Sequence, residues 1–433
     1  MADTTLVFLS FFALFGLILM RVPIAIAMGL VGLVGGWMVN GFFSVGFILG
    51  TIPFDSVFPY GLSVVPLFVM MGVFAARAGL SKALYDSVHA FMGHFRGGLA
   101  MATVGACAVF GAICGSSLAT AATMCRVAMP EMRARKYDDG LASATIAAGG
   151  TLGVLIPPSV IMVIYALLTE QSIGKMFSAA LIPGLVATAL YMAAITIWTW
   201  RNPALGPADA KMPWSGRLQA LKRVWPIGLL FTLVIGGIYL GWFSPTEAAA
   251  VGAAGALLLA ALRGALTKSV FLDSMTETAV TSGMIFLVLI GTALFNYFVE
   301  SAGLPQALVS FVIDLGWAPM AVLVALIAFY LILGCFMDAL SMILLTLPFV
   351  YPLITSLGLD PIWFGVIMVS VVEVGLITPP VGMNLFIIMA GTPGLTLGTI
   401  SRGIVAFLVA DAARLVLLVL FPALSLWLPS FMK

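Results

Sequence analysis

Two carboxylates in this sequence lie inside long apolar stretches, and they are the first candidates for chemistry. Asp338 follows the apolar run 320–337, and Glu373 directly precedes Val374-Gly375. An ionisable side chain in hydrocarbon is costly, so such a residue is a candidate for binding an ion or a substrate. Neither carboxylate has a basic residue close to it in the sequence. Asp338 has a second explanation, because aspartate also caps helix N-termini, and both explanations stay open.

Two breaks rich in glycine and proline interrupt apolar segments. The first is Gly149–Gly153 followed by Pro157-Pro158, and the second is Glu373–Gly375 followed by Thr378-Pro379-Pro380. Proline removes a backbone donor and clashes with the preceding turn, and glycine permits unwound backbone. Both segments are therefore predicted to be discontinuous helices. A carbonyl freed by such a break can coordinate a cation, and the N-terminus of a half-helix can favour an anion.

Oxygen-bearing side chains gather at two further points. Ser116, Ser117 and Thr120 follow the apolar segment that begins near residue 98, and Asp338 occupies the corresponding place in the second half. Hydroxyls, carbonyls and a carboxylate are hard oxygen donors, which suit sodium better than a soft metal. Serine and threonine hydroxyls also hold membrane helices together, so a packing role for each of them stays open.

Enzymatic chemistry finds no support in the sequence. His89 and His94 lie in a loop-like stretch without an HExxH pattern, and there is neither a P-loop lysine nor a GxSxG elbow. We therefore expect no enzyme, no ATP-driven pump and no cofactor. Asp411 and Arg414, three residues apart, are predicted to pair with each other. Four cysteines without CxxC spacing are interpreted as buried thiols: Cys107, Cys114, Cys125 and Cys335.

The composition explains where these residues must lie. Of the 433 residues, 62% are hydrophobic and 8% are charged, whereas soluble domains carry roughly 45–50% apolar and about 25% charged residues. A membrane span needs about 20 mostly apolar residues, and about a dozen segments approach that length: 5–20, 24–50, 62–76, 98–125, 141–169, 177–200, 225–243, 247–262, 279–299, 318–350, 362–392 and 403–430. The net charge of +2 offers no basic surface for nucleic acid. The sequence predicts a multi-pass protein of the lipid bilayer.

An internal repeat relates two halves of the chain. A shift of 222 positions superimposes Gly153–Pro158 on Gly375–Pro380. The same register pairs Pro130 with Pro352, Asp138 with Asp360 and Ser116 with Asp338, and a shift of 224 pairs Gly79 with Gly303. Matches held in register across several apolar segments predict two related units.

The basic residues predict the orientation of these units. Lysine and arginine concentrate in cytoplasmic loops, and a re-entrant hairpin at 98–130 places the basic clusters at 133–136 and 201–223 on one side. The polar connector 201–223 is then a cytoplasmic tether, and loop 300–317, which has no lysine or arginine, is periplasmic. In this arrangement the two repeats are inverted relative to each other.

The predicted fold class is an all-α polytopic membrane protein with two inverted repeats. Each repeat has a re-entrant hairpin and a proline-broken helix. The expected parts are N-terminal scaffold spans at 1–57, the first repeat at 58–200, a cytoplasmic connector with scaffold spans at 201–278, and the second repeat at 279–433.

The two proline motifs, their order and the sequence between them resemble one transporter family. The carrying segments are Gly149–Ser159, Ile182-Pro183-Gly184, Arg126–Arg133, Gly334–Asp338 and Gly375–Asn384. Over essentially the whole chain, the sequence is similar to the large membrane subunit of the tripartite ATP-independent periplasmic (TRAP) transporters. The resemblance implies sodium-coupled import of an organic acid across a bacterial inner membrane. It also implies an elevator mechanism, in which a transport domain moves against a scaffold.

The same resemblance implies positions for the sites and the partners. The first sodium site would use Ser116-Ser117 with Gly149 and Gly153, and the second would use Asp338 with Gly375 and Thr378. Substrate would bind between them, near Pro158, Glu373, Thr378 and Asn384. A separate small four-helix membrane subunit and a periplasmic solute-binding protein would complete the complex, and no cofactor other than sodium is implied.

Two other functions stay open. One is a self-sufficient sodium–dicarboxylate symporter of a related inverted-repeat fold, which would need no binding protein. The other is a structural or enzymatic membrane protein in which the prolines are only kinks.

Overall fold

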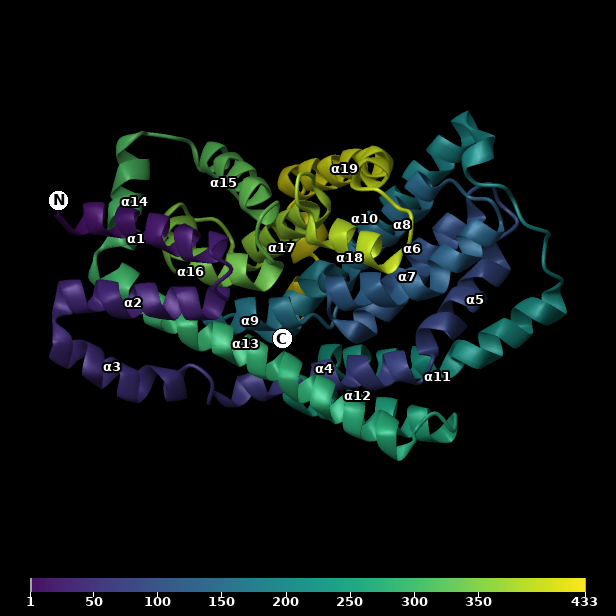
Figure 1. Ribbon diagram of the computed structural model, residues 1–433, viewed down its shortest axis with the longest axis horizontal. Helices are drawn as coiled ribbons and strands as arrows, with labels where there is room; N and C mark the ends of the chain where they lie inside the picture. The colour runs from purple at the N-terminus through teal and green to yellow at the C-terminus, as the bar shows by residue number, and fades with distance from the viewer. Residues whose placement is uncertain (1, 433) are drawn as a thin grey trace.

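A computed structural model describes residues 2–432, and all regular secondary structure in that range is helical (Figure 1). The helices outside the two broken segments and hairpins are α1 (Ala2–Leu19), α2 (Ile24–Asn40), α3 (Phe42–Asp55), α4 (Val64–Arg77), α5 (Leu80–Met92), α10 (Ile173–Arg201), α11 (Trp214–Tyr239), α12 (Pro245–Leu262), α13 (Lys268–Ser301), α14 (Leu304–Asp314), α19 (Leu397–Leu420) and α20 (Ala423–Leu426). Short 3-10 turns lie at Tyr60–Ser63, Pro203–Leu205 and Pro429–Phe431.

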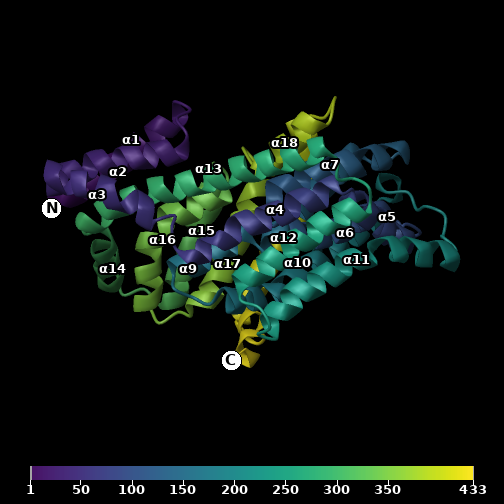
Figure 2. The ribbon, with the colours of Figure 1, turned by 90° about the horizontal axis from the view of Figure 1, so that it is seen from below.

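Long helices form one side of the molecule. Helix α13, with 34 residues, packs along α2 and α4, and α12 packs along α4. Figures 1 and 2 both show α12 and α13 as long rods beside α4. The contact between α2 and α13 depends on small residues, because a Cβ added to Gly32 would lie 2.5 Å from the backbone of Leu294. Close approach through glycine is a common way to associate helices where lipid removes the hydrophobic driving force.

The two halves contain the same order of elements. In the first half a hairpin of α6 (Gly98–Cys114) and α7 (Ser117–Ala134) precedes the broken helix α8 (Asp139–Leu155) and α9 (Val160–Leu168). In the second half a hairpin of α15 (Pro319–Gly334) and α16 (Ala339–Ser356) precedes the broken helix α17 (Pro361–Ile377) and α18 (Met383–Gly391). The two predicted helix breaks are therefore present, and a pair of helices occupies the place of each predicted hairpin. The re-entrant course of the hairpins and the opposite orientation of the two halves in a membrane stay predictions.

Residues paired by the repeat occupy equivalent places. Asp138 and Asp360 cap the N-termini of α8 and α17, each accepting hydrogen bonds from backbone amides of the first turn. A side-chain oxygen at this position satisfies a donor that the helix itself leaves free. Gly79 and Gly303, with φ of 70° and 74°, start α5 and α14 in the left-handed region that favours glycine. These residues, which recur in both halves of the sequence, therefore cap helices or form the turns that start them.

Eight helices in the described range are long and apolar enough to cross a membrane. They are Tyr60–Arg77, Asp139–Leu168, Ile173–Arg201, Trp214–Tyr239, Pro245–Leu262, Lys268–Ser301, Ala339–Ser356 and Leu397–Leu420. Shorter apolar helices occupy other predicted apolar segments. Some of them are parts of the hairpins and of the broken helices. The observed architecture is the predicted all-α polytopic membrane fold.

Three expectations need correction. The apolar segment 24–50 is two helices, because the chain turns at Gly41, whose φ is 80°. His89 lies in helix α5 and not in a loop-like stretch, since Leu80, Leu84 and Tyr85 bury one helical face. The connector 201–223 is partly helical, with α10 continuing to Arg201 and α11 starting at Trp214.

The remaining connector, 202–213, is docked on the molecule. The Asp138 amide donates to the Leu205 carbonyl over 3.0 Å, and the Asp209 carboxylate lies 2.9 Å from Arg135. A hydrogen bond from the Ala210 amide, assisted by Arg135, lowers the pKa of Asp209, so this carboxylate is ionised at neutral pH. The connector therefore ties the end of α10 to the base of the first hairpin.

Candidate functional site

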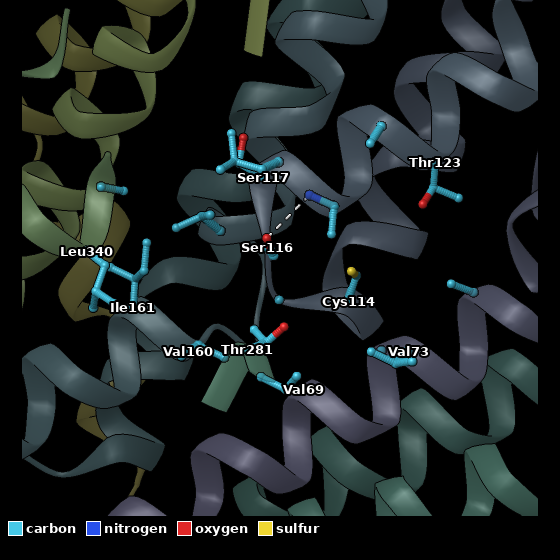
Figure 3. Close-up of a pocket in the computed structure, with 18 of the residues that line it drawn as sticks. Val69, Val73, Cys114, Ser116, Ser117, Thr123, Val160, Ile161, Thr281 and Leu340 are labelled. Atoms are coloured by element: carbon cyan, nitrogen blue, oxygen red, sulfur yellow. Dashed lines mark hydrogen bonds between the residues drawn. The ribbon is translucent and has the colours of Figure 1, made fainter. Parts of the chain in front are cut away.

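A cavity of about 1010 Å³ separates the long helices from the hairpin tips (Figure 3). Its walls come from α4, α5, α6, α7, α8, α9, α13, α16, α17 and α18. Ser116, Ser117 and Asp338 line it from the two tips, and Thr281 lines it from α13. Apolar side chains such as Val69 and Val73 of α4 form much of the opposite wall. A mostly apolar cavity with a few convergent polar groups is the usual form of a small-molecule site.

The charges in this cavity are unevenly paired. Arg77 contacts Glu277 at 2.7 Å and Asp273 at 3.4 Å, so its charge is balanced within the long helices. Arg126 of α7 also lines the cavity, and within residues 2–432 it forms no ion pair or hydrogen bond. An exposed, unpaired guanidinium at a cavity wall is suited to bind a carboxylate, because its planar fork matches the two oxygens. This property of Arg126 was not predicted from the sequence, although Arg126 is the one basic residue within the stretch 97–132.

The first hairpin tip turns through Gly115, whose φ is 65°. Ser116 then caps α7, its hydroxyl accepting from the Ala119 amide over 3.4 Å (Figure 3). The carbonyl of Ser116 accepts a 2.7 Å hydrogen bond from the Thr120 hydroxyl. The tip thus concentrates hydroxyl and carbonyl oxygens beside the cavity.

The second tip has the equivalent arrangement. Asp338 caps α16, its Oδ2 accepting from the Ser341 amide over 3.1 Å. The capping explanation of Asp338 is therefore confirmed, and because the residue also lines the cavity, a role in ion binding stays a prediction. Ser116 and Asp338 are equivalent in position and in hydrogen bonding.

The glycines of the breaks lie against the hairpins. A Cβ added to Gly153 would lie 2.7 Å from Thr120 Oγ1 and 3.1 Å from the Ser116 carbonyl oxygen. A Cβ added to Gly375 would lie 2.5 Å from the Cα of Gly334. Gly149 is packed against Cys107 in the same way. These glycines let each broken helix approach its hairpin closely, which brings their backbone next to the oxygen-rich tips.

The first proline break is buried, whereas in the second break Thr378 and Pro379 are partly buried and Pro380 is exposed. Ser159 caps α9 through the Met162 amide, and Pro158, before it, is buried. In the second break, the Thr378 hydroxyl donates to the Val374 carbonyl over 2.6 Å. Neither Pro158 nor Thr378 lines the cavity, so a substrate contact for them is not supported by the geometry and stays a prediction.

Asn384 links the two halves. Its side-chain amide donates to the Ser117 hydroxyl over 2.8 Å and to the Ala147 carbonyl over 3.2 Å. The side chain is fully buried, and its Oδ1 has no hydrogen-bond partner in the described part of the chain. Asn384 therefore contacts the first tip directly, whereas the family resemblance implied only a position near the substrate.

Glu373 is buried in a separate cluster of charges. Its Oε2 lies 3.3 Å from Arg414, and the predicted pair of Asp411 with Arg414 is confirmed at 3.0 Å. Tyr191 donates to the same aspartate. Sequence spacing could not reveal that Arg414 contacts Glu373, because 41 residues separate them. Glu373 does not line the cavity.

Comparisons with known proteins agree on one family. A profile of the family described as "Tripartite ATP-independent periplasmic transporter, DctM component" matches residues 11–424. The C4-dicarboxylate TRAP transporter large permease protein DctM of Pseudomonas aeruginosa is 37% identical over 385 residues, with 88% of each chain covered. The ectoine/5-hydroxyectoine TRAP transporter large permease protein UehC of Ruegeria pomeroyi is 34% identical over 377 residues, with 86% of each chain covered.

A solved structure shares the fold at low sequence identity. The YdaH transporter of Alcanivorax borkumensis superposes with a TM-score of 0.66 at 16% identity, over 88% of this chain and 89% of that one. This likeness concerns the arrangement of helices alone.

Proposed function

The chain belongs to the family of DctM components of TRAP transporters, which are bacterial inner-membrane proteins, and we propose that it imports an organic acid across that membrane with sodium as the coupling ion. The observation that carries the proposal is the cavity that the unpaired Arg126 lines together with the two oxygen-rich hairpin tips. Such a cavity offers one positive charge for an anion and several hard oxygens for cations.

Arg126 is the group we assign to the substrate. The relatives are named for C4-dicarboxylates and for ectoine, and these compounds share a carboxylate. Because Arg77 is balanced by Glu277 and Asp273, the guanidinium of Arg126 is the cavity's free positive charge among the described residues. One carboxylate of the substrate would bind there, and the apolar wall of α4 would contact its carbon skeleton.

Sodium would bind at the two tips. The first site would use Ser116 and Ser117 with backbone oxygens of Gly149–Gly153, and the second would use Asp338 with Gly375–Thr378. The close approach of each break to its tip supports this assignment. A bound sodium ion would hold tip and break together, which would set the shape of the cavity for substrate.

Movement of the tips against the long helices would carry substrate across. The cavity lies between one wall from α4 and α13 and another from the hairpins and broken helices, so the two walls can move apart without breaking the chain. An elevator of this kind, with the long helices as the scaffold, is the mechanism that we propose.

The proposed partners are a small membrane subunit and a periplasmic solute-binding protein. The family description, "tripartite", supports a complex of this kind. It also favours this assembly over a self-sufficient sodium–dicarboxylate symporter. A structural or enzymatic role is disfavoured because the relatives are transporter permeases.

Uptake by variants of Arg126 tests the substrate assignment. In proteoliposomes with both partners, Arg126→Gln should lower uptake at least about tenfold, which is equivalent to about 1.4 kcal/mol. Arg126→Lys should retain part of it, because the charge remains and the planar fork is lost. Arg402→Gln is the matched control, since Arg402 is exposed on α19 and does not line the cavity. Normal uptake by Arg126→Gln would refute the assignment.

A further inference from the structure

Arg217, in the first turns of α11, is a buried cation without a charged partner. It is 6% exposed and forms no ion pair within residues 2–432. Its Nε and Nη2 are buried and have no hydrogen-bond partner in the same range. A buried charge without a partner is far more costly than a paired one. We therefore expect an anion from outside this chain to bind Arg217.

The carboxylates on the elements next to Arg217 have other partners. Helix α11 packs on α5, α10 and α12, and neither α11 nor α10 contains an aspartate or glutamate. Asp86 of α5 interacts electrostatically with Lys82 of the same helix, and the single glutamate of α12 belongs to the capping box of its own helix. Asp209, in the connector before α11, lies 2.9 Å from Arg135. The elements around α11 therefore supply no anion for Arg217.

Two aromatic rings hold the guanidinium at the start of α11. The Cζ of Arg217 lies 5.2 Å from the centre of the Trp214 ring and 5.7 Å from that of the Phe91 ring. Cation–π contacts use the faces of the rings, so they do not occupy the N–H donors of the guanidinium. Because Trp214 is the first residue of α11, the cation lies beside the first turn of the helix. Pro213, at the N-cap, offers no side-chain acceptor to the backbone amides of that turn, and such a helix end also favours an anion.

An exposed apolar face of α11 starts at the same point. Trp214, Leu218, Leu221 and Trp225 follow one another at intervals of three or four residues, so they lie on one side of the helix. Their exposed fractions are 48–69%. Figures 1 and 2 show the start of α11 at the outer edge of the molecule, with α5 as its neighbour. Tryptophan near the end of a membrane span is typical of the headgroup zone of a bilayer. The unpaired cation thus lies beside an apolar surface at the end of a span.

We propose that Arg217 binds the phosphate of an anionic phospholipid. Its Nε and Nη2 would donate to two phosphate oxygens, as the guanidinium fork allows, and the acyl chains would lie along the apolar face from Trp214 to Trp225. Lys222 and Arg223, both exposed on α11, add positive charge and favour a lipid with a net negative charge. A free phosphate ion would use the same donors but not the apolar face. Arg217 does not line the substrate cavity, and the binding of lipid does not depend on the proposed transport function.

Thermal unfolding of the purified, delipidated full chain in detergent tests the site. A ligand that binds only the folded state raises the melting temperature with its concentration. Wild type is titrated with phosphatidylglycerol, with zwitterionic phosphatidylcholine and with inorganic phosphate. Phosphatidylglycerol should stabilise the protein at lower concentrations than phosphatidylcholine does, and inorganic phosphate should have little effect. An equal response to the two lipids, or a response to inorganic phosphate that matches the response to phosphatidylglycerol, would overturn the proposal.

Replacement of Arg217 tests which residue holds the phosphate. Arg217→Gln should raise the phosphatidylglycerol concentration for half-maximal stabilisation at least about tenfold, because the charge-assisted hydrogen bonds are lost. Arg217→Lys keeps the charge and should retain part of the response. Arg402→Gln removes an exposed arginine of α19 and is the matched control, which should respond as wild type does. A folded Arg217→Gln sample with the wild-type response would refute the site.

A variant beside the guanidinium protects the test against misfolding. Leu218→Glu changes an exposed residue of the apolar face, so it should fold, and its carboxylate should weaken the binding of phosphatidylglycerol by repulsion. If Arg217→Gln does not fold, an unchanged response in Leu218→Glu overturns the proposal. The titration is repeated with the proposed small membrane subunit bound, and the response should persist. Its loss in the complex would show that a group of that subunit, and not a lipid, is the partner of Arg217.

Discussion

Asn384 of α18 donates a 2.8 Å hydrogen bond to the hydroxyl of Ser117 at the tip of the first hairpin. The two residues are 267 positions apart. This bond joins the broken helix of the second half to the hairpin of the first. The two elements that are proposed to hold sodium and substrate are therefore parts of one packed unit.

Replacement of Asn384 should destabilise this unit. Asn384→Leu leaves the Ser117 hydroxyl and the Ala147 carbonyl without their buried donor, so we expect a loss of about 1–3 kcal/mol in stability. A double-mutant cycle with Ser117→Ala, measured by unfolding in detergent, should give a coupling energy of about 0.5–3 kcal/mol. Ser310→Ala, at an exposed position on α14, is the control. Additive effects of the two replacements would show that the bond contributes nothing.

A side chain at Gly375 should separate the second broken helix from its hairpin. In Gly375→Ala the new methyl would lie 2.5 Å from the backbone of Gly334, and overpacking of this kind typically costs about 1–3 kcal/mol. Gly398→Ala is the matched control, because nothing lies within 4 Å of its added Cβ. Melting temperatures in detergent compare the two variants. Equal stability of both would mean that the close approach is not required.

Thr378→Val tests the second sodium site. Valine fills a similar volume but has no hydroxyl, so sodium should bind less tightly while folding changes little. We expect the sodium concentration for half-maximal uptake to rise about tenfold, equivalent to about 1.4 kcal/mol. Thr355→Val is the control, because its hydroxyl also bonds a carbonyl four residues earlier but lies exposed at the end of α16. Unchanged sodium dependence in Thr378→Val would remove this side chain from the site.

The predicted orientation is tested by labelling from outside the cell. Single cysteines in a cysteine-free background should stay unlabelled at 133–136 and in 201–223, because these basic stretches are expected in the cytoplasm. Cysteines within 300–317 should react with an impermeant thiol reagent. Labelling at 133–136 would contradict both the re-entrant first hairpin and the inverted repeats.

Local signals in the sequence predicted much of the fold. Glycine and proline punctuation located both helix breaks, and the pairing of Ser116 with Asp338 located both tips, because caps and breaks depend on residues within a turn of each other. The limits of α5 and the split at Gly41 were missed because helix ends depend on short segments with weak periodicity. Membrane composition also hides periodicity, since both faces of a helix are apolar.

The site was predicted less completely than the fold. Ser116, Ser117 and Asp338 line the cavity as their positions suggested. The proposed role of Arg126 depends on Arg77 being balanced by residues of α13, and the contact of Glu373 depends on Arg414 of α19. Such relationships between distant segments arise from tertiary packing, which no spacing along the chain records.

Uptake driven by an imposed sodium gradient tests the central claim most directly. The chain, its small membrane subunit and the loaded binding protein are placed in proteoliposomes, and accumulation of a radiolabelled organic acid is followed. An inward sodium gradient should drive accumulation, and removal of the binding protein should abolish it. Equal accumulation with potassium, or with a proton gradient alone, would contradict sodium-coupled import.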